Sequence, residues 1–128
     1  MSKITILIVS SPSFSRIMMH LFRGQSEFEV VGTLSGLESL GEQAGKLLPE
    51  LIVASVKPVS IRICRAVAAI KRSSPRSKLI LICPVEDLAR VARKCGADAC
   101  LSDEKLAGQL LRTARTLSER PRLVSAGD

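Results

Sequence analysis

Four cysteines are the side chains best suited to bind a metal or to carry thiol chemistry: Cys64, Cys83, Cys95 and Cys100. No two of them have the short CxxC spacing of a zinc or redox site. The single histidine, His20, lies in a helical pattern away from them, and we expect it to be an exposed helix residue. The sequence therefore predicts reduced thiols, no bound metal and no cofactor.

A second set of reactive side chains follows short apolar runs of the chain. Where parallel strands end, their carboxyl ends meet at one edge of the sheet, and function usually sits there. The residues at these ends are Ser10, Ser11, Ser55, Cys83, Ser102 and Asp103. A serine is weakly nucleophilic without an adjacent base, and no base is spaced beside Ser55. The chain also lacks a glycine-rich phosphate loop, so the sequence does not predict an enzyme.

The elements that would position these side chains alternate regularly. Short, β-branched apolar runs predict buried strands at 4–9, 28–31, 51–54, 79–83 and 99–101. Apolar residues at helical spacing predict helices over 14–24, 35–49, 60–72, 87–94 and 106–117. This alternation predicts a parallel sheet with helices on both faces. We expect one domain at 1–119, and a tail or linker at 120–128.

Two boundaries depend on specific residues. Gly32 is expected to close the second strand. Ser35, with Glu38 three residues later, is a capping-box pattern that predicts the start of the second helix. The inward face of that helix is then Leu37, Leu40, Ala44 and Leu47.

Composition limits the partners of the domain. The net charge is +7 and the sequence pI about 9.8, which would suit nucleic acid or an acidic protein. The basic residues are dispersed, however, and the three Phe with no Trp or Tyr give little to stack on bases. Direct nucleic-acid binding is therefore the less favoured alternative. There is no signal-peptide pattern and no apolar run of membrane-spanning length, so we expect a cytoplasmic chain that does not enter a membrane.

Four segments, in the right order, resemble the receiver domain of response regulators. They are ILIVSSPS at 6–13, FEVVG at 28–32, LPELIVAS at 48–55 and GADACLSD at 96–103. The resemblance covers about residues 3–119. It implies the flavodoxin-like (βα)5 fold, a three-layer α/β/α sandwich whose five-stranded parallel sheet has the order 2-1-3-4-5.

The resemblance also assigns the positions of the family's phosphorylation pocket, where this chain departs from the pattern. The acidic pair that holds magnesium aligns with Ser10 and Ser11, and the phosphate-accepting aspartate aligns with Ser55. The residues that align with the hydroxyl switch residue, the aromatic switch residue and the lysine are Cys83, Cys100 and Asp103.

These departures weaken phosphoryl transfer together. The reaction needs a nucleophile and cations that neutralise the developing charge, and magnesium is normally held by carboxylates. Asp103 puts an anion where the family has a cation. We therefore expect a pseudo-receiver that works independently of phosphorylation, through protein–protein interaction in two-component or transcriptional regulation. The alternative is phosphorylation at an unconventional acceptor.

Two details of this pocket stay open. Asp103 either accepts hydrogen bonds near the serines or is an exposed residue at the start of the last helix, where the dipole favours it. Cys83 and Cys100 either form a redox-sensitive pair or, as we favour, fill the space of the lost switch residues.

In the receiver family, the fourth helix, fifth strand and fifth helix form the usual surface for dimerisation or output. The basic residues of this region are Arg90, Arg93, Lys94, Arg112 and Arg115. They are either an interaction face or ordinary solvated positions. The resemblance implies a protein partner or an attached output domain, with a homodimer as an alternative. The stretch 117–125 is similar to the linker of two-domain DNA-binding regulators, and the second strand to receivers fused to chemotaxis methylesterases.

Overall fold

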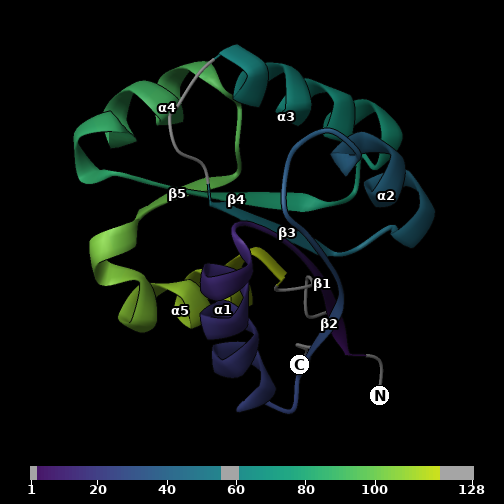
Figure 1. Ribbon diagram of the computed structural model, residues 1–128, viewed down its shortest axis with the longest axis vertical. Helices are drawn as coiled ribbons and strands as arrows, with labels where there is room; N and C mark the ends of the chain where they lie inside the picture. The colour runs from purple at the N-terminus through teal and green to yellow at the C-terminus, as the bar shows by residue number, and fades with distance from the viewer. Residues whose placement is uncertain (1–2, 56–60, 119–128) are drawn as a thin grey trace, which may run out of the picture.

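The computed structural model describes residues 3–55 and 61–118 (Figure 1). The strands are β1 (Ile4–Val9), β2 (Phe28–Leu34), β3 (Leu51–Ser55), β4 (Lys78–Cys83) and β5 (Ala99–Ser102). The helices are α1 (Pro12–Arg23), α2 (Leu40–Leu47), α3 (Ile61–Ser73), α4 (Leu88–Lys94) and α5 (Leu106–Ser118). Short 3-10 turns at Val85–Asp87 and Asp103–Lys105 precede α4 and α5.

All neighbouring strands pair in parallel, in the order β2-β1-β3-β4-β5. Helices α2, α3 and α4 cover one face of the sheet and α1 and α5 cover the other (Figure 1). This arrangement confirms the predicted three-layer sandwich and its strand order. No helix in the described ranges is long and apolar enough to cross a membrane.

The central strands carry apolar residues on both faces because both faces are covered. In β1, Ile6 and Ile8 pack against α1 and α5, whereas Leu7 and Val9 pack against the opposite layer. All four side chains are almost completely buried. Alternation of side chains across a strand therefore converts a continuous apolar run into two cores.

The predicted end of β2 at Gly32 is wrong, because the strand continues to Leu34. β2 stays paired with β1 along its whole length, although the register shifts after Ile6. Gly32 lies inside the strand: a Cβ built on it would come within 3.3 Å of the side chains of Leu7 and Leu47. The glycine therefore permits close packing rather than ending the strand.

The predicted start of α2 is also wrong. Residues 35–39 form bends and a turn, and the helix begins at Leu40 without a side-chain cap from Ser39. Because β2 runs further than expected, the capping-box pattern at Ser35 falls in the connection and not at a helix start. Leu40 and Ala44 are buried as predicted, but Leu47 lies over the edge strand near Gly32 and is 39% exposed.

The other helices agree with the sequence to within a few residues. His20 is exposed on α1, as expected. On α3, Val67 and Ile70 are buried and Cys64 packs against the same core. The predicted first residue of that helix, Ser60, and the tail at 120–128 lie outside the described residues.

Candidate functional site

The carboxyl ends of β1, β3, β4 and β5 meet at one edge of the sheet, as the sequence predicted. Val9 pairs with Ala54, so Ser10 and Ser55 follow on adjacent strands. Ser55 pairs with Ile82, and Cys83 pairs with Ser102. The sheet therefore gathers the residues at the strand ends into one row, which we call the strand-end row: Ser10, Ser11, Ser55, Cys83, Ser102 and Asp103.

Ser10 is buried, and its hydroxyl is fully used inside the chain. Its Oγ donates to the carbonyl of Ser11 at 3.0 Å, and it lies 2.7 Å from Oγ of Ser15 in α1. Either hydroxyl can donate in the contact between the two side chains, and Ser15 Oγ also lies within donating distance, 3.5 Å, of the carbonyl of Ser10. The hydroxyl of Ser10 is thus directed toward the first turn of α1.

Ser11 and Ser55 are the next two members of the strand-end row. Ser11 is exposed and is the N-cap residue of α1, but its side chain makes no capping hydrogen bond. Ser55 is half-buried at the last position of β3. Within residues 3–55 and 61–118, no group of three or more His, Cys, Asp or Glu side chains converges in a way that would hold a metal ion.

Asp103 begins the short turn that leads into α5. Ser102 is the N-cap of this turn, and its Oγ accepts a hydrogen bond from the backbone N–H of Glu104 at 3.1 Å. Asp103 is half-buried in the first turn, where the positive end of the helix dipole favours a carboxylate. Burial is the main cause of the raised pKa of the Cys83 thiol, and the negative charge of Asp103 is one of the smaller contributions to it.

Cys83 and Cys100 lie on the same face of the sheet but are not directly paired. Cys83 is opposite Ser102, and Cys100 is opposite Leu81, so the two thiols are diagonal neighbours. Burial raises the pKa of both thiols, and for Cys83 the charges of Cys100 and Asp87 add to the effect. Both are free thiols, and a raised pKa keeps a thiol protonated and unreactive near neutral pH.

Solved structures of receiver domains superpose on nearly the whole chain. The response regulator domain of CheB from Thermotoga maritima gives a TM-score of 0.75 with 20% identity, over 93% of this chain and 99% of that one. The signal receiver domain of the putative response regulator NarL from Mycobacterium tuberculosis gives 0.77 with 13% identity, over 92% and 98%. The RcsB response regulator of Salmonella typhimurium gives 0.76 with 15% identity, over 98% and 66%.

The chain has the fold of a response-regulator receiver domain. No protein-family model and no curated protein matches the sequence. At identities of 20% or less, the likeness to these structures concerns the fold. The strand-end row occupies the end of this receiver fold at which the sequence resemblance locates the phosphorylation pocket.

Two of the basic residues of α4 and α5, Arg90 and Arg115, form ion pairs. Arg90 of α4 pairs at 2.7 Å with Asp87, the N-cap residue of that helix. Arg115 pairs with Glu27 at 3.1 Å, donates to Gln25 Oε1 at 2.7 Å and lies 6.0 Å from the ring of Phe28. Arg115 therefore ties α5 of the receiver fold to the start of β2.

Arg112 of the same face is exposed, and it forms no ion pair within the described ranges. The side chains of Arg93 and Lys94 lie outside those that the structure describes, although their backbone belongs to α4. The interaction face predicted from the sequence stays a prediction.

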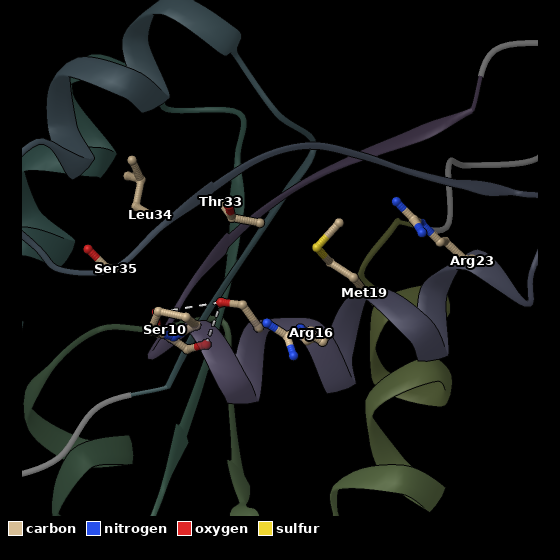
Figure 2. A pocket seen from close by; sticks show the side chains of 9 residues that line it. Ser10, Arg16, Met19, Arg23, Thr33, Leu34 and Ser35 are labelled. Carbon is tan, nitrogen blue, oxygen red and sulfur yellow. Dashed lines mark hydrogen bonds between the residues drawn. The ribbon is translucent and has the colours of Figure 1, made fainter.

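Two features of the receiver fold were not foreseen from the sequence. The first is a surface groove of about 380 Å³ between α1 and the end of β2 (Figure 2), which we call the α1–β2 groove. It is lined at one end by Ser10 and Ser15, and Arg16 and Arg23 contribute two positive charges. The only sequence signal is the spacing of these arginines, which places them on one side of a helix.

The second feature is that all four cysteines belong to one apolar cluster on the α3–α4 side of the sheet. Burial and a hydrogen bond with Cys64 raise the pKa of Cys95 to about 12. The cluster brings together Cys64 from α3, Cys83 from β4, Cys95 after α4 and Cys100 from β5. Spacing along the chain does not reveal this grouping, because it depends on how the helices cross the sheet.

Proposed function

We propose that this chain is a receiver-fold signalling domain that works without phosphorylation, by binding a protein partner or an attached output domain. The observation that carries the proposal is the hydrogen bonding of Ser10 in the strand-end row. Its buried hydroxyl is bonded to Ser11 and Ser15, where a phosphorylated receiver would present a carboxylate to a magnesium ion.

The other members of the row support the same conclusion. A serine hydroxyl at position 55 needs a base to become a nucleophile, whereas a carboxylate is already charged. Asp103 brings a negative charge to the edge where a cation is needed to neutralise a phosphoryl group. Each change disfavours the reaction.

Replacing the clustered acidic residues by serines also changes the electrostatic energy at this end of the fold. Clustered carboxylates repel one another unless a cation is bound, whereas Ser10 and Ser11 are neutral, and the hydroxyl of Ser10 is hydrogen-bonded to Ser11 and Ser15. A domain built this way keeps one arrangement of its strand ends without metal or phosphate. We therefore propose a constitutive binding module and not a switch, and not an enzyme.

Two structurally similar proteins are response regulators or parts of them, which supports a regulatory role for this chain. One similar structure is the response regulator RcsB in complex with DNA, and another is the receiver domain of CheB. In our proposal this chain similarly serves a separate or attached output unit, in the cytoplasm. The exposed Arg112 region of α5 is where we expect an acidic partner surface to bind.

Incubation with acetyl phosphate and magnesium, followed by intact-mass measurement, tests the proposal. We expect no added phosphoryl mass on the natural chain. The comparison variant combines Ser10→Asp, Ser11→Asp, Ser55→Asp and Asp103→Lys, which rebuilds the pocket that the resemblance implies, and we expect it to gain one phosphoryl group. A stoichiometric phosphoryl adduct on the natural chain would contradict the proposal.

A further inference from the structure

The α1–β2 groove has the size of a small-molecule site. Its volume of about 380 Å³ falls at the lower end of the range of roughly 300–1,000 Å³ for ligand pockets. One wall is α1 and the other is the end of β2, where Thr33, Leu34 and Ser35 follow one another (Figure 2). The groove lies between α1 and β2, and β2 pairs with β1, the strand that leads into α1.

The wall formed by α1 presents a cation, an apolar group and a second cation in a row. Arg16, Met19 and Arg23 are spaced by three and four residues, which places them on one side of the helix. Their backbone positions span roughly 10 Å, from a rise of about 1.5 Å per residue. Figure 2 shows Met19 between the two arginine side chains along α1.

Both arginines carry a positive charge that no described residue neutralises. Neither Arg16 nor Arg23 forms an ion pair or a side-chain hydrogen bond with another described residue. The lining of the groove contains no carboxylate. Arg115 shows the contrast, because its guanidinium is held by Glu27 and Gln25. The groove therefore carries two positive charges without an internal counterion.

We propose that the α1–β2 groove binds a small phosphorylated molecule. The phosphate occupies the Arg16 end, where Pro12 and Ser15 mark the first turn of α1 and the helix dipole favours an anion. An apolar or sugar-like body lies against Met19 of α1 and Thr33 of β2. The planar guanidinium of Arg23 takes a second anionic or polar group at the other end.

This inference does not rest on the proposed function. Of the groove residues, only Ser10 also belongs to the strand-end row, and its hydroxyl is already satisfied by Ser11 and Ser15. The ligand is held by non-covalent contacts and transfers no group. A chain that proved to be phosphorylated would keep the same groove.

Titration of the isotopically labelled chain at constant ionic strength tests the proposal through backbone amide shifts. The probes are a nucleoside diphosphate (ADP), the matching nucleoside (adenosine) and inorganic phosphate. We expect saturable shifts with ADP at the amides of Arg16, Met19, Thr33 and Ser35, weaker shifts with phosphate and none with adenosine. Each of Arg16→Gln and Arg23→Gln should weaken ADP binding by about tenfold, because each removes a charge-assisted contact.

The matched control is Arg72→Gln, which removes one exposed positive charge from α3, away from the groove. It should leave the affinity for ADP unchanged, and the amide spectrum of every variant reports whether the chain is folded. Absence of saturable shifts at millimolar ADP would overturn the proposal. Equal weakening by Arg72→Gln and the groove variants would do the same, since it would mean that ADP responds only to the net charge of the chain.

Discussion

The hydroxyl oxygens of Ser10 and Ser15 lie 2.7 Å apart where β1 passes into α1, and both side chains are buried. The pair joins the residue that follows β1 to the first turn of α1. The hydrogen bonds of Ser10 Oγ direct its side chain toward the first turn of α1. They therefore link β1 to α1 and contribute to local stability.

Ser15→Ala removes one hydroxyl of this pair and leaves the hydroxyl of Ser10 with only its bond to the carbonyl of Ser11. We expect the free energy of unfolding to fall by about 1 kcal/mol, the usual net value of a neutral hydrogen bond. Urea unfolding of Ser10→Ala, Ser15→Ala and the double variant measures the coupling. The double variant should lose less than the sum of the single losses, and strict additivity would show that the pair does not interact.

Asp98 connects three elements at the opposite end of the sheet. Its Oδ2 accepts from the backbone N–H of Leu79 at 2.7 Å and pairs with Lys71 at 2.7 Å, and its own N–H donates to the carbonyl of Leu79 at 2.9 Å. Asp98→Ala leaves the N–H of the buried residue Leu79 without its partner, so we expect a loss of about 1–3 kcal/mol in urea unfolding.

Lys71→Ala is the matched control for Asp98, because it removes only the partly exposed ion pair. It should cost less than about 1 kcal/mol. If the two variants destabilise the chain equally, the bond to the Leu79 backbone does not carry the effect.

The pKa of Cys95 makes stability depend on pH in the alkaline range. Burial and the Cys64 hydrogen bond raise this pKa from 9.0 to about 12 in the folded chain. The stabilisation is complete below pH 9, where the thiol is protonated in both states. As the pH rises above 9 the unfolded chain loses this proton first, so stability falls by up to about 1.4 kcal/mol per pH unit.

Urea unfolding of the natural chain and of Cys95→Ala between pH 8 and pH 11 measures this dependence. The natural chain should lose stability more steeply above pH 9 than the variant, while below that pH the difference between the two should stay constant. Parallel curves over the whole range would contradict the assignment of the raised pKa to Cys95.

The sequence predicted best those elements whose environment is uniform. β1, β3 and β4 are covered by helices on both faces, so each is a continuous apolar run. β2 lies at the edge of the sheet and is partly exposed. Its end was predicted at Gly32, although its pairing with β1 extends to Leu34. That error placed the start of α2 too early, because Ser35 was then free to be interpreted as a cap.

For the candidate site, the sequence located the strand-end row but not its hydrogen bonds. Ser10, Ser55 and Asp103 follow predicted strands, and parallel pairing brings such ends together. The bond between Ser10 and Ser15, the groove beside Arg16 and the clustering of the cysteines depend on how helices cross the sheet. Spacing along one element contains no information about those crossings.

The central claim is that the strand-end row neither binds magnesium nor accepts a phosphoryl group. The most direct measurement follows backbone amide shifts of the labelled chain during titration with magnesium and then with beryllofluoride, a phosphoryl mimic. We predict that the amides of Ser55 and Cys83, which lie outside the α1–β2 groove, do not move at millimolar magnesium or after beryllofluoride is added. Saturable shifts at these amides would contradict the account and would identify the domain as a working phosphorylation switch.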